Sequence, residues 1–426
     1  MDKIKIGLLL DTFYPMLDGV ITVLDNYATR LSKIADVTVF VPKANDKDYV
    51  DNFEYKVVRC QRIKLFNFDY SLPIPTLDKE FMDALESAKL DIVHIHSPFA
   101  IGKLGTQYAK KHKIPCVATL HSQYKQDFYK ATKMKGLTEA LLQGAMKTFN
   151  HCDECWAVNE GTKHLYETEY KLKSVCTIQP NGCDMDKYKY SPDEISSFRQ
   201  TLATPEEKLL LYVGRIYSPK NIDLILESCK QLKDNNFKFK FVFVGGGAEL
   251  EHYKKLSDSM SLNDVVTFKG SISNKHELGK YYSAADLFVF PSEYDTDGLV
   301  KKEAAAFNTP SILLENVICS YEIKDSHNGY LAPKNAVAFA QKIMSALNDT
   351  ETYKTVCINA NKELFISWDD AVKNAYKGYL RLIEEKKQKL LEIEKTKIQK
   401  KRRRKLSIQV SKNKHIKKST KKQIKN

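Results

Sequence analysis

The 426-residue sequence lacks an apolar stretch of the roughly 20 residues that a membrane-spanning helix needs. Its first residues, KIKIGLLLD from Lys3, read as a strand and not as the charged and apolar segments of a secretory signal. Its composition is not that of a disordered protein, because 43% of its residues are hydrophobic. We therefore expect a folded, cytoplasmic protein that is long enough for two domains.

The cysteines support neither a disulfide framework nor a zinc site. They number nine and are scattered, which suits a reducing compartment. Cys152 and Cys155 have the spacing of metal ligands, but no second such pair follows at zinc-site distance. We expect free thiols beside a buried strand.

The net charge of +14 is confined to one end of the chain. Residues 386–426 hold 18 lysines and arginines against two glutamates, so residues 1–385 are close to neutral. This basic tail cannot bury enough apolar surface to fold alone, and we expect it to be disordered or helical only on a partner. It could be a solvated run of charge, or it could bind an anionic membrane surface or nucleic acid. Because it has no Phe, Trp or Tyr for base stacking, no specific nucleic-acid partner is expected.

Strand-like runs of Ile, Val and Leu alternate with helical segments, and the pattern restarts after PNGCD at residues 180–184. Runs without polar alternation are typical of parallel strands covered by helices on both faces. The sequence predicts an α/β protein with two doubly wound, Rossmann-like domains that face a cleft, at residues 1–185 and 186–350. C-terminal helices over 351–385 are expected to pack back toward the N-terminal domain, ahead of the basic tail.

In such sheets ligands bind beyond the carboxyl ends of the strands. Arg215 and Lys220 follow the strand-like LLLYV, where they could neutralise a diphosphate or remain two solvated charges. Gly19, ahead of a helix, and Gly246, in the turn VGGGAEL, would give a phosphate access to the backbone. A glycine turn of this kind can also be only a tight connection.

His121 ends the strand-like segment PCVATLH. A single imidazole is usually a satisfied core side chain, but at a strand end beside a cleft it could contact substrate. The following segment could dock at a lipid interface or be an ordinary half-exposed helix. Its interleaved aromatic and basic residues include Tyr124, Lys125, Phe128, Tyr129 and Lys130.

Two carboxylates, Asp295 and Glu303, flank Gly298 after the strand-like LFVFPS. Gly298 suits a loop whose backbone approaches a ligand, and Leu299 begins a predicted helix with Glu303 about one turn inside. The carboxylates could simply compensate the helix dipole. They could also accept hydrogens from vicinal hydroxyls, which a nucleotide sugar offers on its ribose and on its hexose.

Together these motifs resemble retaining glycosyltransferases of family 4, which have the GT-B architecture. The resemblance covers nearly all of residues 1–385 and rests on the order and spacing of DIVHIHSPFAIG, TLHSQY, PNGCD, YVGRIYSPKN, FVGGG, FKGSIS and YYSAADLFVFPSEYDTDGLVKKEA. Within the family, HSPFAIG, TLHSQYKQDF, the DTDGL loop and LFNFDYSLPIP at residues 65–75 are most similar to diacylglycerol glucosyltransferases.

The resemblance implies an N-terminal acceptor domain and a C-terminal nucleotide-sugar domain. Arg215 and Lys220 would hold the diphosphate, and Glu303 the ribose. The family has Glu where this chain has Asp295, one methylene shorter at the expected hexose contact. The implied catalytic residues are His121, Arg215, Lys220 and Asp295. The implied donor contacts are Gly19, Arg215, Lys220, Gly246, Ser271, Asp297, Gly298, Leu299 and Glu303. The implied acceptor or membrane contacts are Tyr124, Lys125, Phe128, Tyr129 and Lys130.

The implied reaction is transfer of glucose from UDP-glucose to 1,2-diacylglycerol with retention. Arg215 and Lys220 would stabilise the leaving diphosphate, so no metal or cofactor beyond the nucleotide sugar is expected. The enzyme would attach peripherally to the inner membrane face, as a monomer or weak dimer. Three alternatives stay open: a saccharide or other soluble glycan acceptor, a nucleic-acid or anionic-surface binding protein acting through the basic tail, and a binding-only relative.

Overall fold

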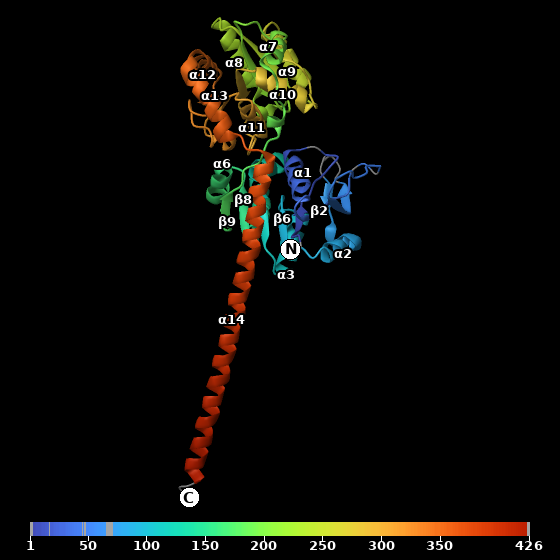
Figure 1. The fold of residues 1–426 in the computed structure, drawn as a ribbon, viewed down its shortest axis with the longest axis vertical. Coiled ribbons are helices and arrows are strands. Elements are labelled where there is room, and N and C mark those ends of the chain that lie inside the picture. Colours follow the sequence, from blue (N-terminus) through green and yellow to red (C-terminus); the bar gives the residue numbers. More distant parts are fainter. Residues whose placement is uncertain (1–2, 17, 45, 47, 65–70, 424–426) are drawn as a thin grey trace.

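The computed structural model describes residues 3–423 except 17, 45, 47 and 65–70. Most of the LFNFDYSLPIP segment therefore lies outside the described residues. Two α/β domains are stacked, and one long helix runs from their junction past the N-terminal domain (Figure 1). The nine cysteines are free thiols, and Cys152 and Cys155 are buried.

The N-terminal domain is built on a sheet of seven parallel strands. The strands are β1 (Lys5–Leu9), β2 (Asp36–Pro42), β3 (Lys56–Cys60), β6 (Ile92–Ile95), β7 (Cys116–Leu120), β8 (Glu154–Ala157) and β9 (Val175–Ile178), in the order β3-β2-β1-β6-β7-β8-β9. The helices of this domain are α1 (Gly19–Leu31), α2 (Lys79–Ser87), α3 (Ala100–His112), α4 (Tyr124–Thr132), α5 (Lys135–Phe149) and α6 (Glu160–His164), and β4 (Arg62–Lys64) pairs with β5 (Ser71–Pro73). The central strands are buried on both faces, as their uninterrupted apolar runs require. Helix α1 and the long helix α14 (Trp368–Gln423) cover one face, and α2, α3 and α5 cover the other.

The C-terminal domain is built on a sheet of six parallel strands. The strands are β10 (Lys208–Val213), β11 (Phe239–Val244), β12 (Val266–Phe268), β13 (Leu287–Phe290), β14 (Ser311–Leu314) and β15 (Tyr330–Ala332), in the order β12-β11-β10-β13-β14-β15. The helices are α7 (Pro192–Gln200), α8 (Ile222–Asp234), α9 (Leu250–Ser259), α10 (Lys275–Ala284), α11 (Leu299–Ala306), α12 (Ala336–Asn348) and α13 (Thr350–Leu364). The two doubly wound domains predicted from the sequence are confirmed.

The chain crosses between the domains twice, and the two crossings lie side by side. Cys183 N donates to Ile366 O at 2.8 Å, and Trp368 N donates to Cys183 O at 3.3 Å. A Cβ on Gly182 would lie 2.4 Å from Trp368 Cα, so this contact needs glycine. Helix α13 still packs in the C-terminal core. The predicted return to the N-terminal domain therefore begins only with α14, at Trp368, and not at residue 351.

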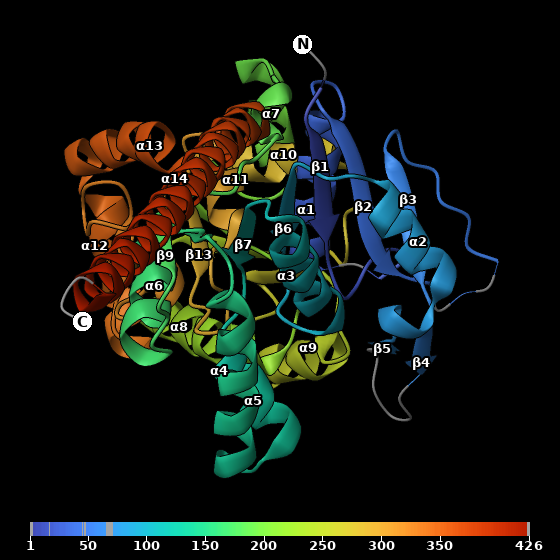
Figure 2. The same cartoon turned by 90° about the horizontal axis from the view of Figure 1, so that it is seen from below.

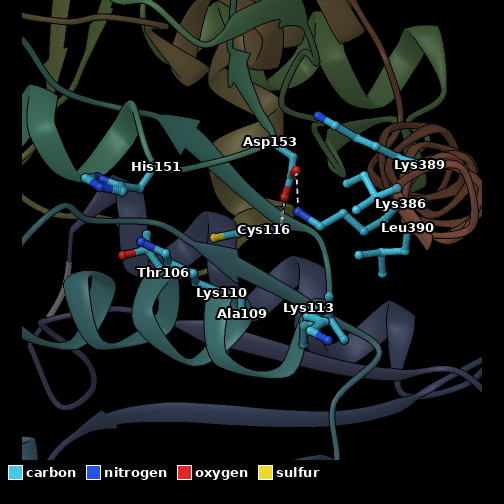
Figure 3. A pocket seen from close by; sticks show the side chains of 12 residues that line it. Thr106, Ala109, Lys110, Lys113, Cys116, His151, Asp153, Lys386, Lys389 and Leu390 are labelled. Atoms are coloured by element: carbon cyan, nitrogen blue, oxygen red, sulfur yellow. Dashed lines mark hydrogen bonds and ion pairs between the residues drawn. The ribbon is translucent and has the colours of Figure 1, made fainter. Parts of the chain in front are cut away.

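Helix α14 is 56 residues long, about 84 Å at 1.5 Å per residue. Arg381 pairs with Glu154 at 2.8 Å. Lys386 pairs with Asp153 at 2.6 Å beside a hollow of about 270 Å³ at the amino ends of the strands (Figure 3). The tail was expected to be disordered or helical only on a partner, whereas the structure continues it as helix to Gln423. The docked first turns supply the costly helix nucleus, and Lys, Arg and Leu extend it readily. Within the described part of the chain, every helix is too short or too polar to span a bilayer.

Candidate active site

The carboxyl ends of the two sheets meet through the loop that follows β13. Thr296 Oγ1 donates to His121 O, at the end of β7, at 2.6 Å. Gln123 Nε2 donates to the carbonyls of Glu293 and Tyr294, both at 3.1 Å. The predicted donor loop and the predicted catalytic histidine are therefore neighbours across the domain boundary.

Lys220 lies just before α8, and its side chain is buried. Its ammonium forms an ion pair with the Asp295 carboxylate, which also accepts a hydrogen bond from Ser292 Oγ at 2.5 Å. The Lys220 Nζ atom is also 5.4 Å from the centre of the Phe290 ring. A buried cation with one carboxylate partner is suited to exchange that partner for an anionic ligand.

Arg215, in contrast, is exposed, and its guanidinium lies 5.8 Å from the centre of the Tyr217 ring. Burial raises the pKa of Asp18, just before α1, and the positive charge of Arg215 opposes this shift. The Asp18 side chain caps α1 by accepting from Ile21 N at 2.8 Å. Gly19 beside it is exposed, and a Cβ added there would have no other atom within 4 Å, so the Gly19 backbone is open to a ligand.

The glycine turn after β11 packs directly on the Arg215 loop. Ile216 N donates to Gly246 O at 2.8 Å. A Cβ on Gly246 would lie 2.5 Å from Ser271 Oγ, and a Cβ on Gly245 only 1.8 Å from Gly214 O. The structure thus brings together Arg215, Gly246 and Ser271, three of the predicted donor contacts.

Gly298 has φ +66° and directly precedes α11, which begins at Leu299 as the sequence predicted. Asp297 differs from its prediction. Its buried carboxylate accepts from Asn181 Nδ2 at 2.8 Å and pairs with the buried Lys302 Nζ at 3.0 Å, so it holds the loop instead of facing a donor. Leu299 packs against the apolar cluster of the N-terminal domain, which gives its side chain a role in domain contact.

Glu303 lies inside α11, where its Oε2 accepts a hydrogen bond from the Tyr282 hydroxyl at 2.8 Å. Burial raises the pKa of Glu303, while the Tyr282 bond and the charge of Lys275 oppose this shift. The ionised carboxylate can accept hydrogens from two hydroxyl groups at once.

His121 stacks on His96, with 5.2 Å between ring centres, and its Nε2 lies 3.0 Å from His96 Nδ1. The ring centres of His94 and His96 are 4.1 Å apart. Burial lowers the pKa of His121 to about 3, so its ring is neutral at pH 7. Sequence reasoning missed His94 and His96, although the alternation in DIVHIHS puts both on one face of a strand.

The predicted acceptor surface divides into a core half and an exposed half. Tyr124 is buried and stacks on Phe128, so it is a core residue and not a membrane contact. Lys125 pairs with Glu139 at 2.8 Å, and Lys130 reaches the Tyr217 ring of the other domain. Figure 2 shows α4 and α5 projecting beyond the rest of the fold. We use the name α4–α5 surface for the exposed apolar residues Tyr129, Met134, Leu137 and Leu141.

Comparisons with known proteins define the class. Residues 17–187 match the model Glycosyltransferase Family 4, and residues 193–363 match Glycosyl transferases group 1. The alpha-monoglucosyldiacylglycerol synthase of Streptococcus pneumoniae (strain ATCC BAA-255 / R6) is 30% identical over 77% of this chain and 75% of that protein. The protein of the same name from Acholeplasma laidlawii is 26% identical over 91% of this chain and 99% of that protein.

Among solved structures, Anabaena HepE in complex with UDP-glucose has a TM-score of 0.65 at 17% identity, covering 88% of this chain and 99% of that one. This likeness shows the shared fold. The chain belongs to glycosyltransferase family 4 and is a retaining glycosyltransferase with the GT-B fold. Members of this class use nucleotide-sugar donors.

Proposed function

We propose that this enzyme transfers glucose from UDP-glucose to 1,2-diacylglycerol, with retention of configuration, where the carboxyl ends of the two sheets meet. The proposed lipid acceptor rests on the similarity to two proteins named alpha-monoglucosyldiacylglycerol synthase, which extends over three quarters or more of the length of each of those proteins. The donor is supported by the ion pair of Lys220 with Asp295 in the loop that leads into α11, the helix that carries Glu303, and by a fold shared with a protein whose structure holds UDP-glucose.

In this proposal the donor diphosphate replaces Asp295 as the main partner of Lys220, and Arg215 approaches it from the exposed side. The two cations stabilise the charge that develops on the leaving diphosphate while the acceptor hydroxyl attacks the same face of the sugar. Asp295, once released from Lys220, is free to accept from a hexose hydroxyl, and Glu303 accepts from the ribose.

The acceptor would come from a membrane. The α4–α5 surface exposes 62% of Met134 and 46% of Leu137, next to Lys133 and Lys135. Apolar side chains beside lysines suit the headgroup region of an anionic bilayer. The exposed lysines of α14 between Lys387 and Lys400 add a second cationic surface, and each cation near such a membrane contributes about 1 kcal/mol.

The test uses the purified full chain, a panel of nucleotide sugars, and diacylglycerol in anionic liposomes. We expect a glucosylated diacylglycerol with the α anomeric configuration, identified by mass and by NMR. A Met134→Ser, Leu137→Ser double variant should bind liposomes more weakly in sedimentation. Ile358→Ser, which changes an equally exposed side chain on α13, is the matched control.

The lipid acceptor would be refuted if the enzyme glycosylates a soluble saccharide, does not bind liposomes and does not react with detergent-dispersed diacylglycerol. The acceptor would then be a glycan. If diacylglycerol is glycosylated from another nucleotide sugar and not from UDP-glucose, only the proposed donor is wrong, and the lipid acceptor stands.

A further inference from the structure

Three histidines form a column that ends at the candidate active site. His94 and His96 come from β6 and the following loop, and His121 comes from the end of β7. The base of the column is held at both ring nitrogens of His94. Its Nδ1 lies 2.6 Å from the Tyr379 hydroxyl on α14, and its Nε2 lies 2.7 Å from Thr119 Oγ1. The column therefore has a fixed lower end, and the middle ring, His96, links it to His121.

The protons of the upper two rings can be counted. A neutral imidazole carries one N–H and one unprotonated nitrogen. Burial lowers the pKa of His96 well below its ordinary value, as it does for His121, so both rings are neutral. The 3.0 Å contact between His96 Nδ1 and His121 Nε2 needs one N–H and one lone pair. Either ring could supply the proton.

The second ring nitrogen of His96, Nε2, decides whether His96 or His121 donates the hydrogen bond between them. His96 Nε2 is buried and has no hydrogen-bond partner in the part of the chain that the structure describes. If His121 donated, the proton of His96 would sit on Nε2 as a buried N–H without an acceptor. If His96 donates from Nδ1, only a lone pair at Nε2 is left unpaired. Buried N–H groups without acceptors are the rarer defect in proteins.

We propose that His96 is a positioning residue, which donates to His121 Nε2 and thereby holds His121 with its own proton on Nδ1. The proposal deepens the proposed function and rests on it for the identity of the ligand. Nδ1 of His121 has no hydrogen-bond partner among the described residues, and the side chain is only half-buried. His121 therefore offers a hydrogen-bond donor to a substrate oxygen, such as a hexose hydroxyl, and is not a base for the acceptor hydroxyl.

The direct test is the tautomer of His121 in the full chain without substrate. Long-range proton–nitrogen NMR on protein labelled with ¹⁵N-histidine separates protonated from unprotonated ring nitrogens, and the His121→Asn spectrum assigns the signal. We expect a protonated Nδ1 and an unprotonated Nε2. A proton on Nε2 of His121 overturns the proposal.

The kinetic test compares two replacements of His96. His96→Leu removes the donor and should lower kcat about 10- to 100-fold, the usual loss when an orienting partner is removed, with little change in the donor KM. His96→Asn places an amide N–H near the position of Nδ1 and should restore most of the rate. Equal losses in both variants would show that His96 only fills space. If the product panel refutes glucosyl transfer to lipid, the NMR result still stands, so the two failures are distinguishable.

Discussion

The two sheets present different chemistry at the ends that face each other. The C-terminal sheet places charged groups there, with Lys220 paired to Asp295 and Glu303 inside α11. At the ends of β6 and β7 the N-terminal sheet places neutral groups, namely the histidine column and the amide of Gln123, while the carboxylates of Asp18 and Asp127 lie just before α1 and on α4. Cations and carboxylates suit a diphosphate and a ribose, whereas neutral donors suit hydroxyl groups without binding free phosphate. In the proposed function, one domain would hold the charged part of the donor and the other would orient the reacting sugar.

The largest loss of transfer activity is expected from a change in the charged groups of the C-terminal sheet. Lys220→Ala should lower kcat/KM for transfer at least 100-fold, the scale seen when one donor to a developing anion is removed. The melting temperature should change little, because the released Asp295 keeps its bond from Ser292. Lys230→Ala is the matched control, since this half-exposed lysine pairs with Asp234 near the end of α8. Near-normal turnover of Lys220→Ala would place the diphosphate elsewhere.

Glu303→Gln should have the next largest effect, through donor binding. The raised pKa of Glu303 means that the carboxyl takes up its proton at a higher pH than an ordinary glutamate, whose pKa is about 4.3. UDP binding to the wild type should therefore weaken as the pH falls toward the raised pKa, because the protonated group loses its capacity to accept from both ribose hydroxyls. The Gln variant should bind UDP about tenfold more weakly at pH 7, a loss of about 1.4 kcal/mol in line with a hydrogen bond to a charged group. UDP affinity is measured by calorimetric titration of both proteins across the pH range, and the difference between the two profiles removes the contribution of the ionisation of UDP itself. Identical pH profiles of UDP affinity in the two proteins would refute the ribose contact.

The charged half of this site could be predicted from the sequence, because strand ends and glycine turns fix where backbone and charge emerge. Arg215, Lys220 and Gly298 all lie at the predicted strand or helix ends. The direction of a side chain at such an end depends on the partner domain. Asp297 turns toward Asn181 and Lys302, which only the packed structure brings near.

The neutral half was less accessible to sequence reasoning. Tyr124 and Phe128 lie four residues apart on one inward helix face, whereas Tyr129 lies on the exposed face, and the alternation of aromatics with lysines obscured that helical periodicity. The histidine column joins β6 to β7 and then to α14, more than 280 residues away in the case of His94 and Tyr379. A short sequence motif does not predict a contact between residues that lie so far apart in the chain.

The neutral side predicts a smaller and more selective effect. Gln123→Met keeps the size of the side chain but loses the hydrogen bonds to the carbonyls of Glu293 and Tyr294. Net losses of about 0.5–1.5 kcal/mol for such bonds correspond to at most about tenfold in kcat/KM. UDP lacks the hexose, so it should bind this variant as tightly as the wild type, unlike Glu303→Gln. Gln107→Met, on the exposed face of α3, is the control. A loss of UDP affinity in Gln123→Met would mean that the neutral sheet also helps to bind the diphosphate, and the division between the two domains would then fail.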